Sequence, residues 1–579
     1  MLILKKVVLY VLRVRKKTER NKKVSRFNLL DEPWISVIVD EKGHNKLVSM
    51  TDVFKHASEY KALAGDMKTQ DFALLRVLLA ALHTVFSRYD IQGNSREFDS
   101  GEDSEDDFNE ETMDIWREVW NSKKFPDAVF KYLEQWHDHF YLFDDKYPFF
   151  QVLKQDIDSK KLGGKSPSEI SGKNINRLIS ESNNKIAVFS PKDNVDNNKS
   201  SLTEPQLARW IITLQSYAGL ADKTMFGTEK YKASKGWLFD LGGIYIEGEN
   251  LFETLMLNCV LVDEMQSPEK KQKPCWEYSG TENIENSFYD TFIDNISQLY
   301  TRWSRAIYIN PDISVDKPIS VSIVKLPDIN HKNAFIEPMT VWQYNKEGEN
   351  KDKYTPRKHR TEEAMWRSFG LLTSQELYDG SVKNHKPGIM EWLNEIKHDI
   401  AGSSISLQAV SMKDDGNATS WVPTDEICDT LYIDEVVVTD NDDDGWVYRI
   451  NNEVEYTRSA IGFIYKQFLL DICEIRNRNK DDATKYSAKH ISQVYFLVDK
   501  PFREWLANIK PKDSMNERCT QWRNTLHNIL INEAKGMLEN ATLRDFTGRP
   551  SDQSEKESTK NIVLAYNIFT SRLKKLSGK

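Results

Sequence analysis

The hydrophobic pattern of the chain is most regular in the stretch DFALLRVLLAALHTVFS, from Asp71 to Ser87. Apolar residues occupy nearly every side of the helix that this stretch predicts, so the helix is expected to be buried all round. Upstream, RFNLLDEPWISV gives an apolar run broken by the turn-prone Asp31-Glu32-Pro33. This pattern predicts an extended segment that enters a core, then a strand that turns at Asp40 to Gly43.

Shorter apolar runs predict a mixture of strands and helices up to about residue 440. The predicted strands are Leu241 to Glu247, Ala306 to Asn310, Ser320 to Leu326, Ile405 to Met412 and Leu431 to Val438, with a further strand that ends at Pro148. The predicted helices are Met113 to Trp136, Asn250 to Val262 and one that starts at the N-cap Thr203, with Pro205 in its first turn. The segments Asp99 to Glu111 and Leu153 to Asn198 are polar, and we interpret them as an acidic loop and a long surface excursion.

The last third of the chain has long helical periods instead. Four helices are predicted, at Val447 to Arg478, His490 to Ile509, Asn516 to Ala541 and Glu555 to Leu576. Short links between long helices are typical of an up-and-down bundle. The predicted fold class is therefore α+β, with a large mixed domain over residues 27–440 and a C-terminal four-helix bundle over residues 441–579.

Residues 1–26 form a basic leader, with ten Lys or Arg residues against one Glu. Its apolar stretch is too short for a secretory signal, and nothing in it is long enough to cross a membrane. Two readings stay open: an arm that binds nucleic acid or anionic lipid, or a mobile or misassigned start. In the second reading the native chain is expected to begin close to Phe27.

Charge and cysteine content limit the class of function. The chain carries a net charge of -9, so without the +9 of the leader the remainder carries about -18. Such a chain does not coat DNA along its whole length, and contact with nucleic acid must be confined to local basic loops. The five cysteines are widely scattered, which fits neither a disulfide framework nor a zinc knuckle and indicates a reducing, cytoplasmic location.

Motifs for catalysis are few. The sequence contains no phosphate-binding P-loop, no dinucleotide-binding glycine motif, no HExxH zinc motif and no GxSxG nucleophile elbow. The remaining candidate is His137-Asp138-His139, where imidazole and carboxylate could share a metal ion in a nuclease. The alternative is an amphipathic pair of surface histidines, since Trp136 and Phe140 flank the motif and no second His and Asp cluster accompanies it.

Several stretches together resemble a known family. FNLLDEPWISV, FYLFDDKYPFFQ, FSPKDN, GWLFDLGGIYIEGENLFETLMLN and DKYTPRKHRTEEAMWRSFGLL follow one another as in CasA, the large subunit of the type I-E CRISPR surveillance complex Cascade. The resemblance covers the chain from Phe27 to the C-terminal bundle. It implies a non-catalytic subunit, without a cofactor, that inspects the protospacer-adjacent motif and helps to open the duplex. The implied partners are the other Cascade subunits, the CRISPR guide RNA, target double-stranded DNA and a recruited helicase-nuclease, and no membrane.

The resemblance also assigns loops that bind nucleic acid. The first loop follows Phe189 and offers Lys192, Asn194, Asn197, Asn198 and Lys199, although a polar loop without a binding role would look the same. The second is the glycine-rich loop, which falls between Gly219 and Gly227 and here contains Lys223 and Thr224. Asp222 departs from a loop of small residues and would repel phosphate, so the motif preference of relatives does not carry over.

Two further elements complete the predicted interface. A wedge hairpin matches SMKDDGNATSW, with Gly416 and Asn417 at the turn and Lys413 behind them; the glutamine usual in the family is absent, and an ordinary hairpin turn is the alternative. A basic loop, KYTPRKHR, supplies Arg357, Lys358 and Arg360 for duplex phosphates, or else is a solvated turn before the next helix.

Overall fold

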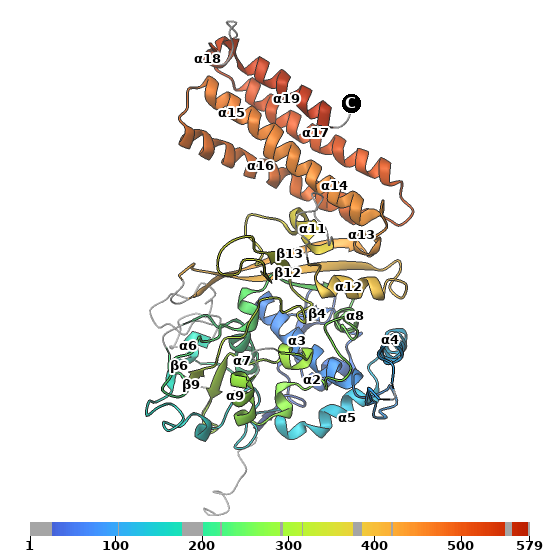
Figure 1. The fold of residues 1–579 in the computed structure, drawn as a ribbon, viewed down its shortest axis with the longest axis vertical. Helices are drawn as coiled ribbons and strands as arrows, with labels where there is room; N and C mark the ends of the chain where they lie inside the picture. Colours follow the sequence, from blue (N-terminus) through green and yellow to red (C-terminus); the bar gives the residue numbers. More distant parts are fainter. Residues whose placement is uncertain are drawn as a thin grey trace, which may run out of the picture.

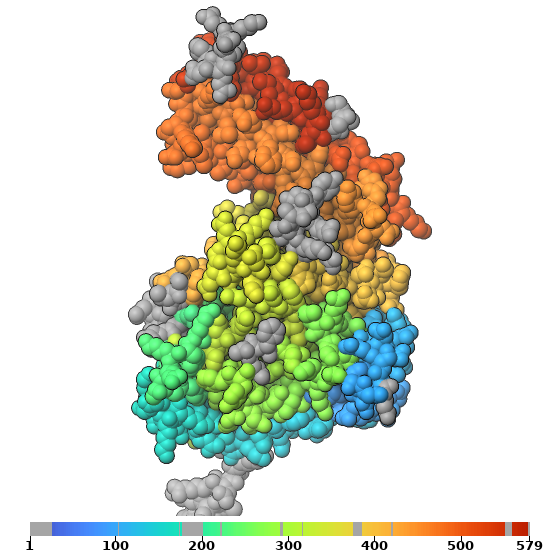
Figure 2. All heavy atoms as spheres, viewed as in Figure 1, coloured from blue at the N-terminus to red at the C-terminus, as the bar shows by residue number. Residues whose placement is uncertain are grey.

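The computed structural model describes residues 26–101, 103–175, 201–220, 223–289, 293–314, 317–373, 385–417, 421–550 and 559–576. Figure 1 shows an elongated molecule, with a lower lobe of helices and strands and an upper lobe of long helices. The space-filling view in Figure 2 shows the upper lobe, in orange and red, packed directly on the yellow part of the lower one. The predicted α+β class is confirmed.

Helix α3, Lys68–Phe86, forms the centre of the lower lobe (Figure 1). Every residue from Thr69 to Phe86 is buried, as the apolar residues on nearly every side of the helix predict. The helix has the length and hydropathy of a membrane span, but all of it lies inside the protein fold. It is thus the core helix on which the surrounding sheets and helices pack.

A three-stranded antiparallel sheet lies above α3, in the order β13-β12-β7. Its strands are β7, Gly243–Glu247, β12, Ser404–Asp414, and β13, Pro423–Asp434. The two long strands form a hairpin in which Leu407 faces Leu431 across the ladder. The predicted strand from Leu431 to Val438 is wrong in its second half, because residues Val436–Thr439 form the short helix α13.

Smaller antiparallel sheets complete the lower lobe. One has the order β3-β2-β4, with β3 at Asn45–Val48, β2 at Ile35–Ile38 and β4 at Ala62–Leu63; another has the order β6-β9-β8, with β6 at Ser168–Ser171, β9 at Ser320–Lys325 and β8 at Arg305–Tyr308. Two pairs of strands form two-stranded sheets: β1, Arg26–Asn28, with β5, Tyr141–Phe143, and β10, Trp342–Tyr344, with β11, Tyr354–Pro356. The predicted turn between Asp40 and Gly43 is confirmed, with Gly43 at a φ of 78°. Arg26, counted in the basic leader, belongs instead to β1, where it pairs with Glu204 at 3.2 Å; residues 1–25 lie outside the described part.

The other helices of the lower lobe range from single turns to α4, which is almost as long as α3. They are α2, Met50–Lys55, α4, Glu105–Ser122, α5, Asp127–Gln135, α6, Gly172–Ile175, α7, Glu204–Tyr217, α8, Leu251–Leu257, α9, Gly280–Tyr289, α10, Ile296–Tyr300, α11, Phe369–Thr373, and α12, Gly388–Glu395. The N-cap at Thr203 is confirmed, since its hydroxyl accepts the Gln206 N–H in a capping box.

Further predicted boundaries in this lobe are wrong. The helix predicted from Asn250 to Val262 ends at Leu257, as α8. The helix predicted from Met113 to Trp136 is two helices, α4 and α5, because Lys123 takes a left-handed conformation and Pro126 follows it. Helix α4 also begins inside the predicted acidic loop, at Glu105. The excursion predicted from Leu153 is exposed over most of residues 158–166, as expected of a surface segment, but it also carries strand β6, whose Ile170 is buried.

The upper lobe is the predicted helical bundle. Its elements are α14, Trp446–Ser459, a π-helical turn, Ala460–Tyr465, α15, Lys466–Ile475, α16, Lys480–Ala507, α17, Met515–Glu539, α18, Leu543–Thr547, the two-residue strands β14, Arg549–Pro550, and β15, Thr559–Lys560, and α19, Ile562–Leu576. Helix α16 starts ten residues before the predicted His490, because Asn479 caps it by accepting the Asp482 N–H. The division at residue 440 into separately folding domains stays a prediction.

Specific polar contacts join the bundle to the hairpin. Arg503 of α16 binds Asp429 of β13 at 2.8 Å, and Lys510 binds Asp434 at 3.1 Å. The indole N–H of Trp366 donates to Asp499 at 2.8 Å. The hairpin is therefore held from below by α3 and from above by α16.

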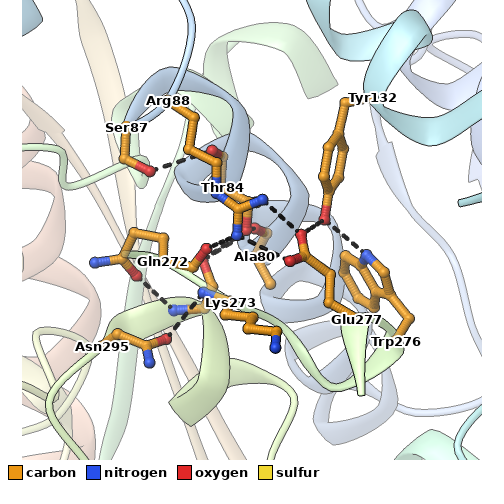
Figure 3. Close-up of polar contacts among 11 residues, drawn as sticks. Ala80, Thr84, Ser87, Arg88, Tyr132, Gln272, Lys273, Trp276, Glu277 and Asn295 are labelled. Atoms are coloured by element: carbon orange, nitrogen blue, oxygen red, sulfur yellow. Dashed lines mark hydrogen bonds and ion pairs between the residues drawn. The ribbon is translucent and has the colours of Figure 1, made fainter. Parts of the chain in front are cut away.

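Buried ion pairs fix α3 within the lower lobe. Arg76 donates to both carboxylate oxygens of Glu337, at 2.7 and 2.6 Å, and both side chains are almost wholly buried. The same carboxylate accepts the indole N–H of Trp237 at 2.6 Å. Beyond the end of α3, Arg88 reaches Glu277, which also accepts from Tyr132, as Figure 3 shows.

Glu337→Gln is expected to lower the free energy of unfolding by about 3–5 kcal/mol, because it leaves the Arg76 guanidinium buried without a counter-charge. Urea unfolding of the full chain, followed by circular dichroism, measures the change. The control is Glu349→Gln, since Glu349 is 90% exposed and its contact with Lys332 is 3.9 Å long. Equal unfolding midpoints for the two variants would contradict the stabilising role of the buried pair.

Asp71 makes the stability depend on pH. Burial raises the pKa of this carboxyl to about 6, from the ordinary 3.8. The folded chain therefore holds a proton that the unfolded chain loses, and its stability falls as the pH rises from about 4 to about 6. Asp71→Asn should remove this loss, worth about 2–3 kcal/mol above pH 6. Melting temperatures of both chains from pH 4 to 8 test this, and a constant difference would disprove it.

Candidate nucleic-acid interface

The turn of the β12–β13 hairpin is a compact polar tip. Gly416 adopts a φ of 66°, which favours glycine, and its N–H donates to the Asp414 carboxylate at 2.9 Å. The Asp415 carboxylate accepts the N–H groups of Asn417 and Val422, both at 3.1 Å. These bonds shape the described part of the tip; residues 418–420 lie outside it.

The predicted wedge residues lie at this tip. Lys413, Gly416 and Asn417 are all exposed. The ladder shifts register between Lys413 and Asp414, which is a bulge of the kind that re-aims side chains at the end of a hairpin. The structure thus confirms the predicted hairpin, while contact of its tip with DNA stays a prediction.

The predicted basic loop divides into two kinds of cation. Arg357 donates to Glu363 at 3.1 Å and to Ser368 at 3.2 Å, and Lys358 binds Asp414 at 2.7 Å. Both charges are thus neutralised within the protein. Arg360 is 69% exposed and lies 3.9 Å from Glu363, so of the three predicted contact residues, Arg357, Lys358 and Arg360, it is the one that can reach a phosphate.

A groove with a volume of about 1,050 Å³ connects these elements. One side consists of the loop from Lys358 to Arg367 with the strand ends near Lys413, and the other side is helix α16. Arg360 and the exposed ring of Phe496 both line it. Cations beside an exposed aromatic ring are typical of surfaces that bind nucleic acid.

The predicted glycine-rich loop is anchored at both ends. The buried Arg305 donates to the Gly219 carbonyl at 2.6 Å, and the Gly227 N–H donates to Lys161 O at 2.8 Å. Thr224 is fixed as well, since its hydroxyl donates to Ser166 O at 2.8 Å. Lys223 and Thr224 are both half-buried, and contact of either residue with DNA stays a prediction.

The remaining predicted residues cannot be placed. Phe189, Lys192, Asn194, Asn197, Asn198 and Lys199 all lie outside the residues that the structure describes. Their role in the first loop stays a prediction.

The two histidines of the candidate metal motif have separate partners. His137 contacts Asp31 through Nε2 at 2.8 Å, whereas His139 stacks on Tyr147 with 3.9 Å between ring centroids. Across the described residues, no group of three or more His, Cys, Asp or Glu side chains is arranged to hold a metal ion. The geometry therefore favours the surface-histidine reading of this motif.

Sequence reasoning missed the residues that hold the hairpin tip in place. Asp240 lies in the 3₁₀ turn Trp237–Asp240, where it binds Lys235 and approaches Lys358 to 3.7 Å. Lys235 in turn lies 4.8 Å from the ring of Trp421, on the far side of the tip. More than fifty residues separate Asp240 from Lys358 and from the hairpin, so no local pattern could have indicated this cluster.

Comparisons with known proteins agree with this fold. The model of the family "CRISPR-associated protein Cse1" matches residues 28–532. The curated CasA/Cse1 of Thermus thermophilus is 27% identical over 258 residues, which are 44% of this chain and only 42% of that relative's length. The crystal structure of Thermobifida fusca Cse1 superposes with a TM-score of 0.75, at 24% identity, and covers 96% of this chain and 98% of that one.

Two further solved structures have the same fold at lower identity. The structure of Thermus thermophilus CasA (Cse1) gives a TM-score of 0.64 at 18% identity and covers 96% of this chain and 99% of that one. A chain from a CRISPR RNA-guided surveillance complex gives 0.63 at 14% identity, with 94% and 99% covered. Since the family match extends over most of the sequence, the resemblance to CasA is confirmed, and the chain belongs to the Cse1 family of CRISPR-associated proteins.

Proposed function

We propose that this chain is the large subunit of an RNA-guided CRISPR surveillance complex. In this role it reads the protospacer-adjacent motif in duplex DNA, helps to separate the first base pairs and provides the docking surface for a helicase-nuclease. Family membership supports the assignment to such a complex. Guide pairing then supplies the sequence specificity, so the chain needs to read only a short motif and the shape of the duplex.

The single observation that carries the proposal is the anchored polar tip of the β12–β13 hairpin. A wedge must keep its shape while base pairs are separated, at a cost of a few kcal/mol for each unstacked step. The described turn has this property, because its backbone N–H groups bind Asp414 and Asp415 and its base is tied to Lys358. Its exposed Lys413 and Asn417 offer donors for base edges or phosphates.

The charge of the chain fits a subunit with local contacts. A net charge of -9 repels DNA on average, so productive contact must come from cations placed beside the tip. Arg360 and Lys413, which line the groove beside the tip, are the described candidates there, and Lys223 of the glycine-rich loop is a further candidate. The other subunits and the guide RNA would organise the rest of the target. A nuclease acting through His137-Asp138-His139 is the second class of function, and the separate partners of the two histidines do not favour it.

Binding of a motif library tests the proposal directly. The complex is assembled with wild-type chain or with Lys413→Ala, Asn417→Ala or Lys223→Ala, and bound targets are sequenced. We expect the wild type to enrich a short flanking motif and the variants to lose discrimination by about 1–3 kcal/mol per base read, while guide pairing persists. Unchanged enrichment in all three variants would show that the chain acts only as a scaffold.

The two arginines of the basic loop should differ in their effect on binding. Arg360→Gln is expected to weaken target binding about equally for all sequences and to reduce the salt slope of log K by about one, as the loss of one phosphate contact requires. Arg357→Gln is the matched control, because its guanidinium already binds Glu363 and Ser368. Titrations of target DNA from 50 to 200 mM salt measure both slopes. Equal slopes for wild type and Arg360→Gln would contradict the assignment.

A further inference from the structure

Two lysines hold the hairpin tip, one from each side, and both meet at Asp240. Lys358 binds Asp414, at the end of β12, at 2.7 Å and lies 3.7 Å from Asp240. Lys235 forms an ion pair with the other oxygen of Asp240 and lies 4.8 Å from the ring of Trp421, which precedes β13. The Asp240 carboxylate thus lies beside both of the lysines that contact the two flanks of the turn.

The contacts continue from the lysines into the turn itself. The Asp414 carboxylate that accepts from Lys358 also accepts the Gly416 N–H at 2.9 Å. On the other flank, the Trp421 N–H donates to Asn417 O at 2.8 Å while Trp421 adopts a φ of 45°. A bulky residue persists in that conformation only where its surroundings fix it, and Lys235 beside its ring contributes to this.

Asp240 is itself fixed by the core. It ends the 3₁₀ turn that begins at Trp237, whose indole N–H donates to the buried Glu337 at 2.6 Å. The Trp237 ring also stacks on His331, with 4.1 Å between centroids. A continuous series of contacts therefore connects the buried ion pair of α3 to the hairpin turn. Glu337 contacts Trp237, the 3₁₀ turn joins Trp237 to Asp240, and Asp240 contacts the lysines at the turn.

The lysines of this cluster favour the ionised form of the Asp240 carboxyl. Burial alone would raise the pKa of Asp240, but Lys235, His331 and Lys358 together hold it below its ordinary value, so the carboxyl is ionised at neutral pH. Lys235 is 18% and Lys358 24% exposed, and both ammonium groups lie over the Phe239 ring, at 5.0 and 4.1 Å. Without the carboxylate the two cations would repel one another across a partly desolvated site.

We propose that Asp240 is a positioning residue for strand separation: it holds Lys235 and Lys358 so that the β12–β13 turn keeps the shape required to enter the duplex. This role rests on the proposed function of the hairpin as a wedge. It differs from a contact with DNA, because Asp240 is an anion and acts through the two lysines. Its loss should affect the opening of base pairs rather than the pairing with the guide.

The test compares a fully paired target with one whose first base pairs beside the motif are already mismatched and open. The assembled surveillance complex carries wild-type chain, Asp240→Asn or Asp328→Asn. The last is the matched control, since Asp328 binds Lys232 at 2.6 Å and makes no ion pair or hydrogen bond with the described part of the tip. We expect Asp240→Asn to bind the paired target roughly tenfold more weakly, and the open target as well as wild type does.

The possible outcomes separate the positioning role of Asp240 from the wedge role of the hairpin. Equal affinity of Asp240→Asn and wild type for the paired target overturns the positioning role, and so does an equal loss on both targets, which would indicate general misfolding. Asn417→Ala in the same assay separates this inference from the wedge itself. If Asn417→Ala is defective on the paired target and Asp240→Asn is not, only the inference fails. If both match wild type on the paired target, the proposed function of the hairpin fails with it.

Discussion

The buried ion pair between Arg76 and Glu337 is the contact on which the arrangement of the lower lobe depends. A guanidinium in the middle of an otherwise apolar helix requires a buried counter-charge, and Glu337 supplies both of its oxygens. Because the same carboxylate accepts from Trp237, the core helix and the 3₁₀ turn that presents Asp240 are fixed by one group. The buried polar groups of the lobe are thus connected to the hairpin turn through Asp240 and Lys358.

The hairpin also depends on the upper lobe. Its strand β13 binds Arg503 and Lys510 of the bundle, while its turn is tied to the lower lobe through Lys358. A movement of the bundle would therefore change the width of the groove, because one wall of the groove lies on each lobe.

Much of the fold could be predicted because it follows local rules. The apolar surface of α3, the capping box at Thr203 and the long periods of the bundle each indicate their structure within a short window. The wrong predictions have two causes. In one, a single residue changes the direction of the chain, as Lys123 does between α4 and α5; in the other, pairing with a distant strand makes a polar segment into a strand, as β9 does for β6. Arg357, Lys358 and Arg360 look alike in sequence, and only their partners separate the two structural cations from the exposed one.

The proposed role of this chain is to help open the duplex beside the guide. To measure opening, 2-aminopurine is placed in the first target base pair next to the motif, and its fluorescence is followed as complexes assembled with and without the chain are added. We expect a rapid rise in fluorescence, which reports unstacking, only when the chain is present and the motif is correct. An equal rise without the chain would show that the chain does not open the duplex.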